Sequence, residues 1–129
     1  MSEVRYVLDA SALLAAMLGE RGAKAVEAHF SGACISAVNL SEVVAKLTER
    51  GVPDVAVHES LADLDLDVRD FDMKQALRAG VLRNATRSQG LSFGDRACLA
   101  LAVELDAIAL TTDGAWASLE IDVAIELAR

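Results

Sequence analysis

Apolar residues along this chain recur in two alternating patterns, short continuous runs and longer stretches with helical spacing. Short apolar runs typical of buried strands occur at residues 5–8, 33–35, 108–111 and 123–127, and residues 64–68 alternate between apolar and polar as in a half-buried strand. Stretches with the apolar spacing of an α-helix occur at residues 10–18, 24–30, 40–47, 53–64, 73–87, 96–105 and 115–119. Strands that alternate with helices are typical of a parallel sheet covered by helices on both faces. The pattern therefore predicts an α/β protein with three α/β/α layers and a central parallel sheet of about five strands.

The third predicted strand differs from the others in its polar positions. Leu64, Leu66 and Val68 alternate with Asp65 and Asp67, which indicates a strand with one face in water near the edge of the sheet. The aspartates between residues 63 and 72 do not form a calcium loop of the EF-hand type, because the run lacks the glycine and the terminal glutamate of that motif. We interpret this run as solvated surface.

The length of 129 residues suits one domain, and we expect residues 1–129 to form it. With 53% hydrophobic and 25% charged residues, the chain is not of the disordered class. The net charge of −8 argues against a protein that holds nucleic acid mainly through phosphate contacts. It does not argue against an enzyme that meets phosphate through bound divalent cations.

The apolar runs, the first residues and the cysteines argue against a membrane-spanning protein, a secreted protein and a zinc site, respectively. The longest unbroken apolar runs, 12–18 and 97–103, are far shorter than the roughly 20 residues of a membrane span. The first residues lack the basic start and apolar stretch of a signal peptide. Cys34 and Cys98 stand alone in apolar stretches, with no CxxC pair, and predict buried thiols rather than zinc ligands. We therefore expect a soluble, cytoplasmic protein.

Acidic side chains follow the predicted strands at one edge of the sheet. Asp9 comes directly after the first strand, and Asp113 follows the strand at 108–111. Asp95 opens an apolar helix, and Glu42 lies in the first turns of the helix after the second strand. Ligands of parallel sheets bind at the carboxyl ends of the strands. Carboxylates gathered there would repel one another unless they bound a hard divalent cation such as Mg²⁺.

Each of these acids also has a purely structural interpretation. Asp9 and Asp113 could cap the helices that follow them. Asp95 completes a capping box with Ser92, and Glu42 lies opposite the apolar stripe of its helix, where a solvated glutamate would lie. Spacing alone leaves both interpretations open.

Four local sequences, in this order along the chain, carry a resemblance to a known family. They are VLDASALL at 7–14, ISAVNLSEV at 35–43, LSFGDRACLALA at 91–102 and LTTDGAW at 110–116. Together they resemble the PIN-domain ribonucleases, and among these most closely the VapC-type toxins of bacterial toxin–antitoxin pairs. The resemblance extends roughly from residue 4 to residue 127. It implies the same fold that the apolar pattern predicts.

The resemblance also implies a set of site residues. The catalytic acids that bind one or two Mg²⁺ or Mn²⁺ ions would be Asp9, Glu42, Asp95 and Asp113. Ser11 would orient Asp9, and Thr111 would be the hydroxyl near Asp113. Gly114 and Ala115 supply no further acid where some PIN nucleases carry one, which leaves the number of metal ions open.

By the same resemblance, the protein would be a metal-dependent endoribonuclease toxin that hydrolyses RNA. A cognate VapB-like antitoxin would bind an apolar groove beside the site, to which the helix at 10–18 could contribute, and the toxin would form a homodimer. The alternative is a housekeeping RNA-processing nuclease or, beyond that, a PIN-like module that binds without catalysis. A small antitoxin gene immediately upstream would separate toxin from housekeeping enzyme.

Basic side chains leave two further alternatives open. Lys74, Arg78, Arg83 and Arg87 on one predicted helix could hold an RNA backbone or could belong to a solvated face. Arg96 could contact substrate or could balance the charge of the acidic residues beside it. Trp116 is expected to serve packing rather than base stacking.

Overall fold

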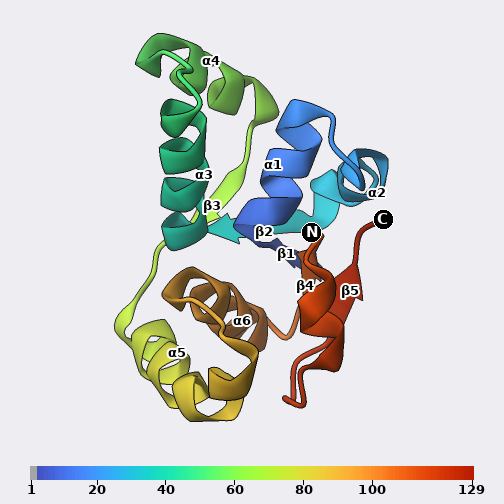
Figure 1. Cartoon of the computed structure of the whole chain (residues 1–129), viewed down its shortest axis with the longest axis vertical. Helices are drawn as coiled ribbons and strands as arrows, with labels where there is room; N and C mark the ends of the chain where they lie inside the picture. Colours follow the sequence, from blue (N-terminus) through green and yellow to red (C-terminus); the bar gives the residue numbers. More distant parts are fainter. Residues whose placement is uncertain (1–2) are drawn as a thin grey trace.

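Five parallel strands form one sheet in the order β3-β2-β1-β4-β5, with helices on both of its faces (Figure 1). The computed structural model describes residues 3–129. The strands are β1 Tyr6–Leu8, β2 Ala33–Ser36, β3 Asp67–Arg69, β4 Ile108–Thr111 and β5 Ile125–Leu127. This arrangement confirms the predicted α/β class with three α/β/α layers and a parallel sheet.

Six α-helices and three short 3₁₀ segments connect and cover the strands in the described part of the chain. The helices are α1 Ala10–Leu18, α2 Ala23–Glu27, α3 Ala37–Glu49, α4 Asp54–Leu64, α5 Met73–Thr86 and α6 Phe93–Leu105. The 3₁₀ segments are η1 Phe30–Gly32, η2 Arg87–Gln89 and η3 Gly114–Ser118. Within residues 3–129, no helix is long and apolar enough to span a membrane.

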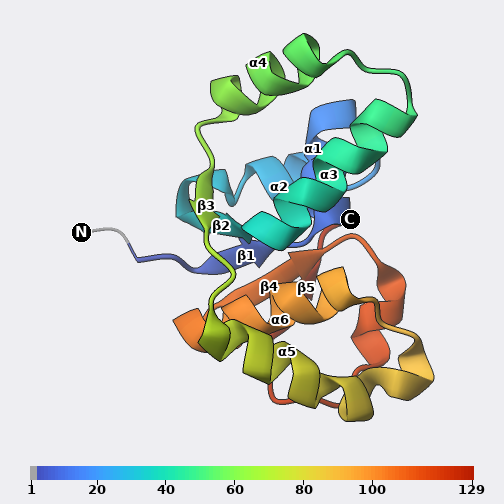
Figure 2. The same ribbon diagram turned by 90° about the vertical axis from the view of Figure 1, so that its left-hand side faces the viewer.

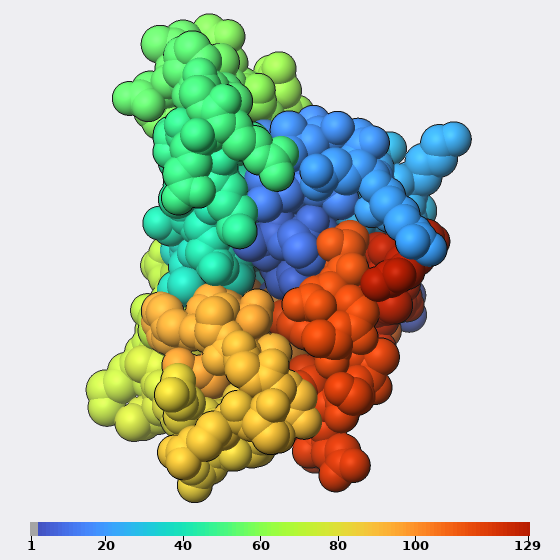
Figure 3. All heavy atoms as spheres, in the orientation of Figure 1, coloured from blue at the N-terminus to red at the C-terminus, as the bar shows by residue number. Residues whose placement is uncertain are grey.

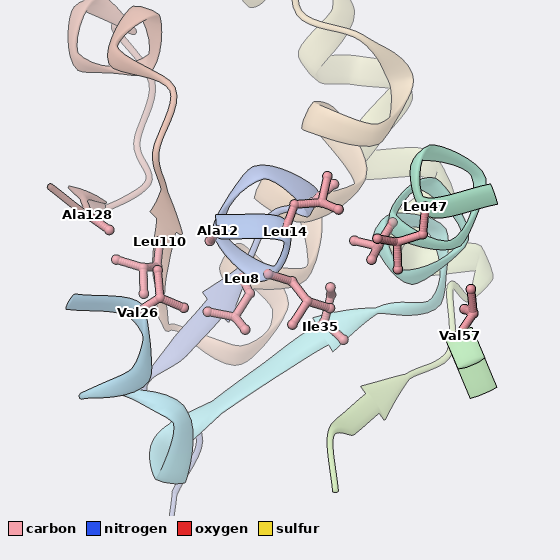
Figure 4. Close-up of a cluster of buried hydrophobic side chains, with 12 residues drawn as sticks. Leu8, Ala12, Leu14, Val26, Ile35, Leu47, Val57, Leu110 and Ala128 are labelled. Atoms are coloured by element: carbon pink, nitrogen blue, oxygen red, sulfur yellow. The ribbon is translucent and has the colours of Figure 1, made fainter. Parts of the chain in front are cut away.

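One face of the sheet is buried by the helices of the first half of the chain. Leu8 pairs in register with Ile35 and Leu110, so these three side chains point to the same face. They pack with apolar residues of α1, α2, α3 and α4 in the cluster that Figure 4 draws. Figure 2 shows α3 and α4 lying on the opposite side of the sheet from α5 and α6.

The opposite face is buried by α6. Val7, Cys34 and Ala109 point to this side and pack with the apolar residues of α6 and with Trp116, which is 1% exposed. The expectation that Trp116 serves packing is confirmed. Helix α5 packs on α6 and forms the outermost part of this layer.

The third strand is shorter and begins later than the sequence pattern predicts. Helix α4 continues through Leu64, and Asp65 ends it in the left-handed conformation with φ 49°. Leu64 and Leu66 are therefore partly buried against the core from the end of a helix and from a connecting segment, and the strand starts only at Asp67. Helix packing and strand alternation produce the same apolar spacing over so few residues. The predicted position at the edge of the sheet is confirmed.

Candidate functional site

A cleft of about 450 Å³ opens at the carboxyl edge of the sheet, beside the ends of β1 and β4. Its walls come from α1, from α3, from the start of α6 and from the segment after β4, which meet near the centre of the face in Figure 3. The carboxylates predicted from the sequence all line it, together with other polar residues: Asp9, Glu42, Asp95, Asp113, Ser11, Glu20, Lys46, Arg50, Ser92 and Thr112. The structure thus brings together side chains, such as those of Asp9 and Asp113, that lie more than a hundred residues apart.

Asp9 forms the floor of this cleft and is held by three donors. It caps the N-terminus of α1, where one carboxylate oxygen accepts hydrogen bonds from the backbone N–H of Ala12 at 2.8 Å and from the Ser11 hydroxyl at 2.7 Å. The other oxygen accepts from the Thr111 hydroxyl. The side chain is only 3% exposed. The cap interpretation of Asp9 and its place in the cleft are both correct.

The two hydroxyls predicted beside the acids connect Asp9 to the segment after β4. Ser11 Oγ accepts a hydrogen bond from the backbone N–H of Thr112 at 3.1 Å. Thr111 Oγ1 accepts one from the backbone N–H of Asp113 at 3.0 Å while its own proton is donated to Asp9. Each hydroxyl therefore fixes the Asp9 carboxylate relative to the loop that carries Asp113.

The pKa of Asp9 is raised from its ordinary value of 3.8 to about 6. Burial is the largest cause, because desolvation disfavours the charged carboxylate. The hydrogen bonds from Thr111, Ala12 and Ser11 act in the opposite direction, and the negative charge of Asp95 raises the pKa further. A positive charge placed near Asp9 would therefore stabilise the ionised form of its carboxyl group and lower its pKa.

Glu42 is positioned by two residues whose role the sequence analysis missed, Asn39 and Gly94. Asn39 is 1% exposed, and its Nδ2 donates to Glu42 Oε1 at 2.9 Å and to the backbone oxygen of Gly94 at 2.9 Å. A Cβ atom at residue 94 would collide with the Glu42 carboxylate. Asn39 therefore connects α3 to α6, and the glycine leaves the space that Glu42 occupies. The available signals were the i, i+3 spacing of Asn39 and Glu42 and a glycine directly before Asp95.

Electrostatic interactions link three of the acids. Burial raises the pKa of Glu42, the hydrogen bond from Asn39 lowers it, the charge of Asp95 raises it, and the charge of Lys46 lowers it. Since Asp95 also raises the pKa of Asp9, its charge acts on both neighbours. The interpretation of Glu42 as a solvated surface residue is wrong, because α3 lies between α1 and α6 and this side of it faces the cleft.

Asp95 and Asp113 are helix caps and cleft residues at once. Asp95 Oδ2 accepts from the backbone N–H of Ser92 at 3.0 Å, and Ser92 Oγ accepts from the backbone N–H of Asp95 at 3.1 Å, which completes the predicted capping box. Asp113 caps η3 by accepting from the backbone N–H of Ala115 at 3.0 Å. The cap fixes the position of each carboxyl group at the rim of the cleft. Capping and lining the cleft are not exclusive alternatives.

The donor set of the cleft matches a hard divalent cation in kind. The acids supply carboxylate oxygens, which Mg²⁺ and Mn²⁺ prefer, and neither histidine nor cysteine lines the cleft. As the side chains lie, no group of three His, Cys, Asp or Glu residues within 3–129 is close enough to hold a metal ion. Binding would therefore draw the half-buried Glu42 and Asp95 and the exposed Asp113 towards Asp9.

The basic residues of the cleft are not those that the sequence analysis weighed. Arg96 points away from the cleft and donates from Nη1 to the backbone oxygen of Ala79 at 2.8 Å, which holds α5 against α6. Lys74 and Arg78 line a separate depression on α5. The basic side chains in the cleft are instead Lys46 of α3 and Arg50, the residue that ends this helix.

Comparison with known proteins places these features in a family. The sequence model of the PIN domain family, described as "PIN domain", matches residues 6–121. No curated protein sequence matches the chain. The family match confirms the resemblance that the four local sequences carry.

Several solved structures share the fold at low sequence identity. A chain of a toxin–antitoxin complex from Klebsiella pneumoniae superposes with a TM-score of 0.73 at 20% identity, covering 96% of this chain and 98% of that one. A chain of VapBC2 from Rickettsia felis, bound to a DNA fragment from its promoter, gives 0.72 at 17% identity, with 94% and 96% covered. A chain of VapBC-5 from Mycobacterium tuberculosis gives 0.64 at 19% identity, with 98% of each chain covered. These likenesses show the fold.

Proposed function

We propose, because the chain belongs to the PIN domain family, that it is a metal-dependent endoribonuclease and the toxin of a toxin–antitoxin pair. One observation carries the proposal. Asp9, Glu42, Asp95 and Asp113 come from four separate segments and line a single cleft at the carboxyl edge of the sheet. The reaction is hydrolysis: the oxygen of a water molecule bonds to a phosphorus atom of the RNA backbone, and a P–O bond to one of the flanking riboses breaks.

The four acids would hold Mg²⁺ or Mn²⁺. Burial and the charge of Asp95 raise the pKa values of Asp9 and Glu42, and a cation bound by the carboxylates would lower both pKa values. A bound divalent cation supplies a water of lowered pKa and offsets negative charge on the phosphodiester under attack.

Neutral residues of this chain keep the acids in place for that chemistry. Ser11 and Thr111 donate to Asp9 and so restrict the rotation of its carboxylate. Asn39 does the same for Glu42 through one hydrogen bond. Because these hydrogen bonds orient carboxylates that would bind the cation, we expect the loss of these donors to lower activity without unfolding the chain.

The toxin assignment rests on the neighbours and on a groove next to the cleft. The structural neighbours include chains of VapBC structures. We infer from them that this chain binds an antitoxin. Ala16, Met17 and Leu18 at the end of α1 line an apolar groove of about 310 Å³ together with α3 and α4. Leu14 of the same helix lines the acidic cleft. A VapB-like antitoxin segment in this groove would lie beside the catalytic residues and could block them.

The remaining parts of the proposal follow from the resemblance. We place residues 1–129 in a single PIN domain, expect a homodimer in solution, and expect the protein in the cytoplasm. Light scattering of the purified chain measures the dimer directly. A small gene immediately upstream, whose product co-purifies with this chain, would favour the toxin over a housekeeping RNA-processing nuclease.

The decisive experiment is cleavage of total bacterial RNA by the purified, antitoxin-free protein, with Mg²⁺ or Mn²⁺ and with EDTA. Asp9→Asn is the test variant, and Asp67→Asn is the matched control, since Asp67 lies exposed on the edge strand and outside the cleft. We expect cuts with metal in the wild type and the control, and none with EDTA or in Asp9→Asn. One dominant 5′ end would favour the toxin.

Two other outcomes of this experiment would contradict the proposal. Metal binding without cleavage would favour a non-catalytic PIN-like module. Cleavage that persists in Asp9→Asn would place the chemistry elsewhere in the molecule.

A further inference from the structure

Helix α3 carries a row of charged side chains along the side that faces the cleft. Glu42 and Lys46 of the helix and Arg50, the residue that ends it, follow one another at intervals of four residues, and all three line the cleft. Residues four apart on a helix are neighbours on one face and are separated by about 6 Å along the axis. The row therefore begins with the acid Glu42, and the two positive charges follow it along the helix.

Lys46 lies close enough to the acids to act on them. Its charge lowers the pKa of Glu42, in opposition to burial and to the charge of Asp95. The side chain is exposed and makes no ion pair within the described residues, so its ammonium group is free to bind an incoming anion.

Arg50 is held only loosely. Its Nη1 lies 3.9 Å from Glu20 Oε2, and the two side chains are 53% and 50% exposed. Glu20 follows the end of α1, so this pair connects α3 with the segment after α1 across the mouth of the cleft. Exposed ion pairs at this distance contribute little to stability. A stronger anion can therefore take Arg50 from Glu20.

Three other basic side chains of the described chain are engaged outside the cleft. Arg96 binds the backbone of Ala79, Arg69 pairs with Asp67, and Lys74 pairs with Glu104. None of these three lines the cleft. The protein has a net charge of −8, so most of its surface repels a polyanion. The positive charges of Lys46 and Arg50 beside the acids therefore mark where a polyanion can approach.

We propose that Lys46 and Arg50 form a phosphate track along α3 that binds the RNA backbone next to the scissile phosphate, and that Glu20 holds Arg50 until RNA displaces it. This inference rests on the proposed nuclease function. The spacing of the two residues along the helix is comparable with that of neighbouring phosphates in an extended strand. Glu20 is thus a competitor of the substrate for Arg50, and its removal is expected to strengthen RNA binding.

The test measures the affinity of a fluorescent single-stranded RNA in EDTA, where metal-dependent cleavage is suppressed. Lys46→Gln and Arg50→Gln are each expected to weaken binding three- to tenfold, and Glu20→Gln is expected to tighten it about twofold. Each lost phosphate contact lowers the slope of log affinity against log salt by about 0.7. Lys74→Gln on α5 and Asp63→Asn on α4 make the same charge changes outside the cleft and control for net charge.

The inference is overturned if wild-type protein binds no RNA, or if Lys46→Gln and Arg50→Gln bind RNA as tightly as Lys74→Gln. It is also overturned if Glu20→Gln weakens binding. These failures are distinct from failure of the nuclease proposal, which would appear as wild-type protein that does not cut RNA with Mg²⁺ or Mn²⁺. Unchanged melting temperatures of the Lys46 and Arg50 variants would show that the fold is intact.

Discussion

Two groups of acidic side chains in this molecule lie in opposite surroundings, one exposed on the surface and one gathered in the cleft. The run between residues 63 and 72 holds five aspartates close together in sequence, yet they lie exposed along the end of α4, the edge strand and the start of α5. Asp9, Glu42, Asp95 and Asp113 are scattered over the chain and gather in one cleft.

The difference appears in the two aspartates that best represent each region. Arg69 donates two hydrogen bonds to Asp67 at 2.7 and 2.9 Å and lowers the pKa of that carboxyl group. Burial raises the pKa of Asp9 to about 6. The same residue type is thus stabilised as an anion on the surface and destabilised as an anion in the cleft. Local density of acids in the sequence does not make a site; the topology that buries them together does.

A contrast of opposite sign is expected between Asp9→Asn and Asp67→Asn in the absence of metal. Asp9→Asn removes a charge that burial disfavours, so the melting temperature should rise by roughly 3–8 °C, equivalent to about 1–2 kcal/mol. Asp67→Asn removes an exposed ion pair and should cost about 0–1 kcal/mol. Thermal unfolding with and without Mg²⁺ measures both. Mg²⁺ should stabilise the wild type and Asp67→Asn but not Asp9→Asn.

A melting temperature of Asp9→Asn that equals or falls below that of the wild type at neutral pH, with the same response to Mg²⁺, would remove the basis for a shared cation site.

The pH dependence of stability sharpens the same contrast. Because the pKa of Asp9 lies at about 6 in the folded chain and near 3.8 when unfolded, the folded state holds the proton more tightly. The contribution of this tighter proton binding to the free energy of unfolding is fully present below pH 3.8 and is lost as the pH rises through about 6. The advantage of Asp9→Asn over the metal-free wild type should therefore vanish near pH 4 and reach its full size above pH 6. A difference that stays constant across this range would contradict the raised pKa.

Two glycines on neighbouring helices test how tightly the cleft is built. Gly94→Ala would push a methyl group into the Glu42 carboxylate and should cost about 1–3 kcal/mol together with most of the activity. Gly80→Ala in α5 meets no atom within 4 Å and should stabilise the chain by roughly 0.5–1 kcal/mol. Urea unfolding and the RNA cleavage assay measure the two effects. Equal stability and equal RNA cleavage of the two variants would mean that the Glu42 side chain can move aside without loss of stability or activity.

The smallest effect on stability separates the two roles of Asp95. Ser92→Ala and Asp95→Asn each weaken the capping box of α6 and should each cost at most about 1 kcal/mol. Only Asp95→Asn removes a charge from the cleft, so only this variant should lose RNA cleavage while remaining folded. If both variants retain full activity, Asp95 serves only as a cap.

Much of the site could be predicted because it depends on element order. Asp9 and Asp113 follow strands that end at the same edge of a parallel sheet, and this placement needs no knowledge of packing. The fold followed in the same way from apolar runs that alternate with helical spacing. The third strand was misplaced at its start because α4 and β3 share the same apolar spacing around Leu64 and Leu66.

The residues that were missed depend on which way a helix face points. Lys46 and Arg50 lie on the polar side and at the end of α3, which sequence periodicity assigns to solvent. That side faces a cleft because α3 is packed against both α1 and α6, a long-range relation that the pattern of one helix does not contain. Asn39 is buried for the same reason, since its partner on α6, Gly94, lies 55 residues away in sequence.

The central claim, that four scattered carboxylates form one cation site, is tested most directly by titrating the purified protein with Mn²⁺ and measuring the free ion by electron paramagnetic resonance. The wild type and Asp67→Asn are expected to bind Mn²⁺ with the same affinity, and Asp9→Asn is expected to lose at least ten times in affinity. Equal Mn²⁺ binding by the wild type and Asp9→Asn, or no binding by the wild type, would contradict the account.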